Sequence, residues 1–230
     1  MKKIYIIHGW TYTTDAWGAC IAALREKGCE PIMLNVPGLT KPSSEVWTLE
    51  KYVAWLKTKV ESERDLALVG HSNGGRIAIA FAATYPEIVQ KLILVDAAGI
   101  AHHEFLLEVK RVVFGVVAKV GRIFTTSPFL RKAFYRLIGA RDYERASENM
   151  RTTMKNLIGR DLTPELEHIT APTLIIWGEK DTATPLSDAH IMHERIHGSE
   201  LYTIPDAHHS PHALHPVLVA NKIANWLERR

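Results

Sequence analysis

Short apolar runs alternate with longer segments of helical period along most of the chain. An apolar run of about four to eight residues is typical of a strand buried in a parallel sheet, whereas apolar residues spaced about three or four positions apart indicate an amphipathic helix. The pattern predicts six strands, at 3–7, 31–35, 66–69, 91–95, 173–177 and 200–204. It also predicts helices near 16–27, 49–63, 74–84, 185–197 and 214–228, with Gly28, Pro86 and Gly198 at expected helix ends.

This alternation predicts an α/β fold in which a mostly parallel sheet of about six strands is flanked by helices. The alternation of strand and helix patterns stops between 100 and 161, because this stretch has a helical pattern and no strand-like run. We therefore expect the domain core to comprise residues 1–99 and 162–230. Residues 100–161 are expected to form a helical cap insertion that covers one edge of the sheet.

Composition and charge narrow the class of protein. A chain of 230 residues that is 47% hydrophobic can bury one large core, and its formal net charge of +3 is too small to favour nucleic acid as a partner. The insertion is the basic part, with 12 Lys or Arg against 5 Asp or Glu between 101 and 160. This charge suits an acyl substrate that carries negative charge or a surface that touches anionic lipid, and solvated helix faces explain it equally well.

Targeting signals and cysteines give further expectations. The apolar run at 4–7 is shorter than the central region of a signal peptide, and no window approaches the roughly 20 apolar residues of a membrane span. We expect a cytoplasmic protein without stable membrane insertion, whose partner is a small molecule. Cys20 and Cys29 are expected to be buried thiols rather than a disulfide. The oligomeric state stays open.

The segment 70–74, with the sequence GHSNG, fits the pattern G-x-S-x-G and has the context that this motif requires. It follows the predicted strand 66–69 and opens the Ala-rich helix at 74–84. A serine on such a strand-to-helix turn, the nucleophile elbow, is presented at a helix N-terminus, where a developing negative charge is stabilised. Ser72 is therefore the candidate nucleophile. The alternative is a glycine-rich turn with an incidental serine.

A serine nucleophile needs a base that accepts its proton, and the base needs an acid that orients it. Asp181 follows the predicted strand 173–177, and His209 follows the predicted strand 200–204. The carboxyl ends of parallel strands meet at one edge of a sheet, so both loops are expected to converge on Ser72.

Several segments together resemble the α/β-hydrolase superfamily, in particular its small capped esterases and carbon-carbon bond hydrolases. The dipeptide at 8–9, His-Gly, resembles the oxyanion loop of this family. Residues 74–96 resemble the nucleophile helix and the next strand, and residues 169–181 resemble the acid-bearing strand and loop. The resemblance covers the chain outside the insertion and implies the α/β-hydrolase fold.

By position, the resemblance implies a catalytic triad of Ser72, His209 and Asp181. It also implies that the backbone N–H groups of Trp10 and Asn73 form the oxyanion hole. It implies neither a metal nor an organic cofactor.

The chain departs from the family pattern at two positions and offers an alternative at a third. Thr11 stands where many members have glycine, and His208 stands where the family usually has glycine before its histidine. His209 is favoured over His208 because the segment Ser-Pro-His at 210–212 follows it as in relatives. Asp96 is a second possible acid, since some members place theirs after the strand that follows the nucleophile helix.

A competing motif lies near the end of the chain. His193, Glu194 and His197 match H-E-x-x-H, which on a helix places two imidazoles on one face for zinc, with the glutamate as base. Gly198 ends the predicted helix directly after the motif, and no third ligand follows at the usual spacing. The other interpretation is the polar face of a surface helix.

The function expected from these features is hydrolysis of a small or medium carboxylester, or a related acyl bond, through an acyl-enzyme. A carbon-carbon bond hydrolase and an amidase or peptidase of the same fold stay open, since the fold alone does not choose among them. A zinc metallohydrolase and a non-catalytic binding protein are more remote alternatives.

Overall fold

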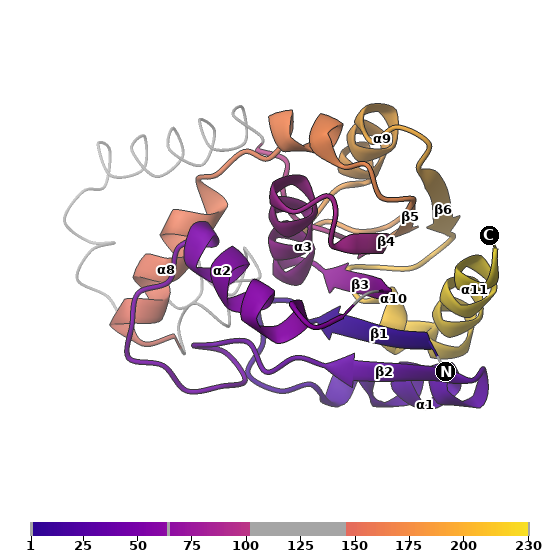
Figure 1. Ribbon diagram of the computed structural model, residues 1–230, viewed down its shortest axis with the longest axis horizontal. Helices are drawn as coiled ribbons and strands as arrows, with labels where there is room; N and C mark the ends of the chain where they lie inside the picture. The colour runs from indigo at the N-terminus through magenta and orange to yellow at the C-terminus, as the bar shows by residue number, and fades with distance from the viewer. Residues whose placement is uncertain (1, 64, 102–145, 230) are drawn as a thin grey trace, which may run out of the picture.

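The computed structural model describes residues 2–63, 65–101 and 146–229 (Figure 1). Within these residues, six strands form one sheet in the order β2-β1-β3-β4-β5-β6, and every neighbouring pair is parallel. The strands are β1 Lys2–Ile7, β2 Cys29–Met33, β3 Leu66–His71, β4 Val89–Val95, β5 Thr173–Gly178 and β6 Glu200–Ile204. The predicted α/β class with a sheet of six strands is confirmed.

Helices cover both faces of the sheet (Figure 1). On one face, α1 (Gly18–Glu26) and α11 (Pro216–Glu228) pack against each other. On the other face, α3 (Asn73–Thr84) packs on β3 between α2 (Leu49–Val60) and the 3-10 helix η2 (Pro164–His168), and α9 (Leu186–Arg195) packs on β5. The remaining described helices are η1 (Asp15–Trp17), α8 (Glu148–Ile158) and α10 (Pro211–Leu214).

The apolar core lies in two layers, one on each face of the sheet. In β1, Ile4 and Ile6 belong to the layer under α1 and α11, whereas Tyr5 and Ile7 belong to the layer under α2 and α3. Because both faces are covered, strands of this sheet read as continuous apolar runs rather than as an alternation of apolar and polar residues. Cys20 and Cys29 are buried free thiols, as expected.

Residues 102–145 of the predicted cap insertion, with its excess of basic residues, lie outside the described residues, while both ends of the insertion are described. At its base, the Asp161 carboxylate accepts a hydrogen bond from the Ala101 backbone N–H (3.1 Å), and Arg76 donates to the Arg160 carbonyl oxygen (2.7 Å). These bonds hold the two ends together beside α3. Among the described residues, no helix combines the length and apolar character needed to cross a bilayer.

Candidate active site

Ser72 lies on the sharp turn between β3 and α3. Its backbone has φ 52° and ψ −121°, a positive φ that costs a non-glycine residue about 1 to 3 kcal/mol. The turn also requires glycine two residues later, since a Cβ on Gly74 would lie 2.1 Å from the Ile7 carbonyl oxygen of β1. This close approach presses the start of α3 onto the carboxyl end of the sheet. The predicted strand, turn and helix around Ser72 are thus found.

Two hydrogen bonds connect Ser72, His209 and Asp181 in a chain. The Nε2 atom of His209 lies 2.9 Å from the Ser72 hydroxyl oxygen, and its Nδ1 atom lies 2.7 Å from Oδ2 of Asp181. His209 comes from the loop between β6 and α10, and Asp181 comes from the loop after β5. The structure therefore brings together the three side chains that the motifs selected from separate parts of the sequence.

The Asp181 carboxylate is buried and surrounded by hydrogen-bond donors. Its Oδ1 accepts from the backbone N–H groups of Ala183 (2.7 Å) and Thr184 (3.1 Å), and its Oδ2 accepts from the Thr184 hydroxyl (2.7 Å). Burial alone would raise the pKa of Asp181, but the hydrogen bond and charge of His209, together with the Thr184 bonds, hold this pKa below its ordinary value. The group is therefore a carboxylate at neutral pH and can stabilise an imidazolium.

Asp96, the alternative acid, lies near His209 but makes a different contact. Its Oδ1 accepts the Gly178 backbone N–H at 2.9 Å, and its Oδ2 is buried without a hydrogen-bond partner among the described residues. Burial, and then the charge of Asp181, raise the pKa of Asp96 to about 8. Asp181 thus has the carboxylate that meets the His209 ring. The alternative base, His208, is exposed to solvent.

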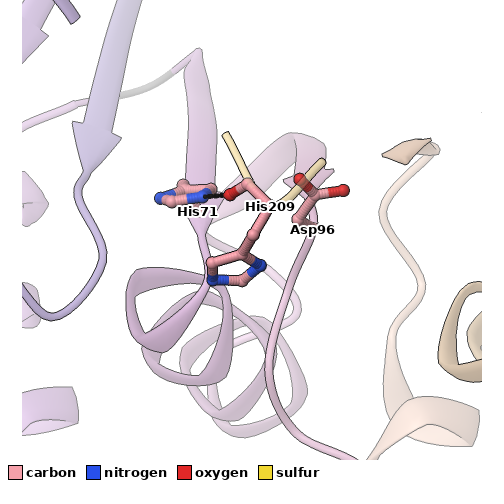
Figure 2. A group of neighbouring side chains, drawn as sticks. All are labelled: His71, Asp96 and His209. Carbon is pink, nitrogen blue, oxygen red and sulfur yellow. Dashed lines mark hydrogen bonds between the residues drawn. The ribbon is translucent and has the colours of Figure 1, made fainter. Parts of the chain in front are cut away.

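Figure 2 shows the side chains of His71, Asp96 and His209 gathered together. One carboxylate oxygen of Asp96 and one ring nitrogen each of His71 and His209 lie within 4.8 Å of one another. Both ring nitrogens of His209 already face Ser72 and Asp181, and Nε2 of His71 faces the His209 carbonyl oxygen at 2.8 Å. A cation bound here would have to displace these hydrogen bonds.

The two residues expected to supply the oxyanion hole border the same cavity as Ser72. Asn73 is the first residue of α3, where backbone N–H groups have no partner within the helix. Trp10 follows Gly9, which packs so closely that a Cβ there would lie 3.0 Å from the Cβ of Ser72. Trp10, Asn73 and Ser72 all line one cavity of about 320 Å³.

A second cavity, of about 470 Å³, also borders Ser72 and is lined by residues of the loop after β1. Five residues line both cavities: Trp10, Ser72, Met154, Ala183 and His209. Met154 comes from α8, so a helix at the end of the predicted insertion contributes to the site. Neither Met154 nor Thr184 was singled out from the sequence. For Thr184, its place three residues after Asp181, typical of an Asx-type turn, was an available signal.

The H-E-x-x-H motif does not form one helical face. The helix α9 ends at Arg195, and Ile196 adopts an extended conformation with ψ 105°, so His197 lies beyond the helix. The prediction of a helix up to residue 197 is therefore wrong by two residues. Nδ1 of His193 instead lies 2.9 Å from the Ser199 hydroxyl oxygen. The geometry that would place both imidazoles one helical turn apart is absent from this described segment.

Comparisons of the sequence and of the structure with known proteins both find alpha/beta hydrolases. The model of the alpha/beta hydrolase family matches residues 4–222. The uncharacterized hydrolase YugF of Bacillus subtilis is 25% identical over 251 residues, covering 99% of this chain and 90% of the relative. A 2-hydroxy-6-oxononadienedioate/2-hydroxy-6-oxononatrienedioate hydrolase of Escherichia coli is 25% identical over 259 residues, covering 99% and 88%. An esterase structure from Exiguobacterium antarcticum has the same fold, with a TM-score of 0.76, 21% identity and coverage of 100% and 92%.

Proposed function

Since this chain belongs to the alpha/beta hydrolase family, we propose that it is a serine hydrolase of small or medium carboxylesters, in which Ser72, His209 and Asp181 form the catalytic triad. The observation that carries the proposal is the hydrogen-bonded chain from the Ser72 hydroxyl through both ring nitrogens of His209 to Asp181. A nucleophile, a base in contact with it and a group that orients the base are the parts that this chemistry requires.

The hydrogen-bond pattern sets where the protons lie. The Asp181 carboxylate only accepts, so Nδ1 of His209 carries the hydrogen in the neutral ring and Nε2 has a lone pair directed at the Ser72 hydroxyl. As Ser72 attacks the ester carbonyl carbon, Nε2 takes the hydroxyl proton, and Asp181 stabilises the imidazolium that forms.

The remaining steps use the same groups. The backbone N–H groups of Trp10 and Asn73 would donate to the oxyanion of the tetrahedral intermediate. The imidazolium of His209 then gives its proton to the leaving alkoxide, and the acyl-enzyme forms. A water molecule, deprotonated by His209, attacks this ester, and the carboxylic acid leaves as Ser72 recovers its proton.

A second reaction stays a candidate because of one relative. The Escherichia coli protein that is 25% identical is a 2-hydroxy-6-oxononadienedioate hydrolase, so a carbon-carbon bond of such a substrate is the alternative to a carboxylester. The two cavities that border Ser72 give room for two parts of such a substrate.

The test compares the wild type with Ser72→Ala and His193→Ala on p-nitrophenyl acetate, p-nitrophenyl butyrate and a 2-hydroxy-6-oxo dienoate. Ester hydrolysis that is lost in Ser72→Ala, kept in His193→Ala and indifferent to a chelator supports the proposal. A preference for the dienoate would assign the second reaction. Activity that survives Ser72→Ala and disappears with a chelator would contradict the serine mechanism and favour a zinc hydrolase.

A further inference from the structure

His71 is a buried histidine with no part in the mechanism above, although it directly precedes Ser72. It ends β3 and is 7% exposed. Its Nε2 atom lies 2.8 Å from the backbone carbonyl oxygen of His209, a contact between residues 138 positions apart in the chain (Figure 2). The last residue of the nucleophile's strand is thus bonded to the backbone of the residue that carries the base.

The chemistry of the acceptor fixes the tautomer of the His71 ring. A carbonyl oxygen only accepts hydrogen bonds, so Nε2 of His71 is the donor and carries the hydrogen. The other ring nitrogen, Nδ1, lies against Gly9, where an added Cβ would approach it to 3.0 Å. The ring is therefore confined on both edges, and its N–H points at the His209 backbone.

Aromatic neighbours hold this ring in place. The His212 ring lies edge-to-face to it, with centroids 4.4 Å apart, and Trp17 lies edge-on at 6.2 Å. Burial lowers the pKa of His71 well below its usual range, with further lowering from the charges of His212 and His209. Burial also lowers the pKa of His212 to about 3. The rings of His71 and His212 are therefore both neutral at physiological pH.

His209 itself sits in a segment without regular structure. The strand β6 ends at Ile204 and α10 starts at Pro211, so the sheet ladder does not hold the backbone of His209. Its ring must nevertheless reach Ser72 and Asp181 at once, at 2.9 and 2.7 Å. A misplacement of about 1 Å can reduce catalysis by as much as ~100-fold, so an anchor for this loop matters.

We propose that His71 is a positioning residue, whose Nε2–H holds the His209 backbone so that the His209 ring spans Ser72 and Asp181. This inference rests on the proposed function, because it assigns to His71 a role in placing the general base. His71 also borders the cavity of about 470 Å³, and the role proposed for it acts through its bond to the backbone of His209.

The test replaces His71 with two amide side chains of different length. Gln carries its amide nitrogen as many bonds from Cα as the Nε2 of histidine, whereas Asn carries it one bond nearer, at the position of Nδ1. Both remove the aromatic ring, so the comparison isolates the donor. We expect His71→Asn to lower kcat for p-nitrophenyl butyrate about ten-fold or more with KM within about two-fold, and His71→Gln to recover most of kcat. Equal losses in both variants, or no loss in either, would overturn the proposal.

Ser72→Ala separates this inference from the proposed function. If Ser72→Ala keeps its esterase activity, the serine mechanism itself is wrong, whatever the His71 variants do. If Ser72→Ala is inactive while His71→Asn and His71→Gln behave alike, only the role of His71 is wrong.

A spectroscopic measurement keeps the proposal testable even if the His71 variants fold poorly. In wild-type protein with ¹⁵N-labelled histidine, a long-range proton–nitrogen correlation distinguishes the two neutral tautomers. We expect a neutral ring with its hydrogen on Nε2, protected from exchange with water, whose signals disappear in His71→Gln. A His71 ring with its hydrogen on Nδ1, or a charged ring, at neutral pH would contradict the proposed bond.

Discussion

The hydroxyl of Thr184 lies 2.7 Å from Oδ2 of Asp181, the same oxygen that lies 2.7 Å from Nδ1 of His209. Two donors therefore converge on one carboxylate oxygen, while two backbone N–H groups hold the other. This arrangement fixes the carboxylate plane and hence the direction from which it meets the His209 ring.

The Thr184 hydroxyl can be tested with a near-isosteric pair. Thr184→Val removes the donor to Asp181, and we expect kcat for p-nitrophenyl butyrate to fall about ten-fold, since a hydrogen bond to a charged group contributes about 1.5 to 3 kcal/mol. Thr184→Ser keeps the hydroxyl and is expected to stay within about three-fold of the wild type. A valine variant as active as the serine variant would show that the backbone N–H groups suffice.

Amide substitution can test whether Asp181 or Asp96 is the acid that orients His209. We expect Asp181→Asn to lower kcat on the order of 10³- to 10⁴-fold, because an amide no longer selects the Nδ1–H tautomer of His209 or stabilises the imidazolium. Asp96→Asn keeps an oxygen for the Gly178 N–H and is expected to lower kcat less than about ten-fold. Steady-state kinetics of both variants decide the point, and a larger loss in Asp96→Asn would make Asp96 the acid.

Much of this fold could be predicted because the signal is local. The four inner strands contain apolar runs, since both faces of the sheet are buried there, and the strand-to-helix turn at Ser72 has its own sequence pattern. The bounds of β2 were less accurate, as the structure places it at Cys29–Met33 rather than 31–35. Pro31 lies inside β2, which is an edge strand, where a missing N–H is tolerated.

The contacts that support the site could not be predicted from the sequence. The bond from His71 to the His209 carbonyl joins the last residue of β3 to the loop after β6, and these two segments meet only in the folded chain. Likewise, Asp96 and Asp181 each follow one of two neighbouring strands, β4 and β5, so sequence position alone does not rank them as candidate acids. The surroundings of the two carboxylates distinguish them. Donors from Thr184 and His209 contact Asp181, whereas Oδ2 of Asp96 is buried without a partner among the described residues.

Burial of Asp96 predicts a pH dependence of stability. Its pKa rises from the ordinary 3.8 to about 8 in the folded protein. Between these pH values the folded state keeps the proton and the unfolded state loses it, so the contribution of Asp96 to the free energy of unfolding falls as pH rises. Below this window both states are protonated, and above it both are ionised, so the loss is then complete.

Asp96→Asn removes this titration and keeps the shape. We expect the free energy of unfolding of the variant, relative to that of the wild type, to rise between pH 4 and pH 8, by at most about 1.4 kcal/mol per pH unit. Urea denaturation of both proteins between pH 4 and pH 8 measures the difference in their free energies of unfolding. The titration of all other groups is common to both proteins and cancels in this difference. A difference that does not change with pH would show that Asp96 titrates normally in the folded protein.

The packing of the nucleophile turn predicts opposite effects at two glycines. A Cβ on Gly74 would lie 2.1 Å from the Ile7 carbonyl oxygen, whereas a Cβ on Gly18, at the start of α1, would meet nothing within 4 Å. We expect Gly74→Ala to lower the free energy of unfolding by about 2 kcal/mol or more, because rigid backbone cannot yield, and to reduce activity. Gly18→Ala is expected to raise the free energy of unfolding by about 0.5 kcal/mol, since alanine restricts the unfolded chain. Urea denaturation compares the two, and a tolerated alanine at 74 would mean that α3 does not press on β1 as closely as the geometry requires.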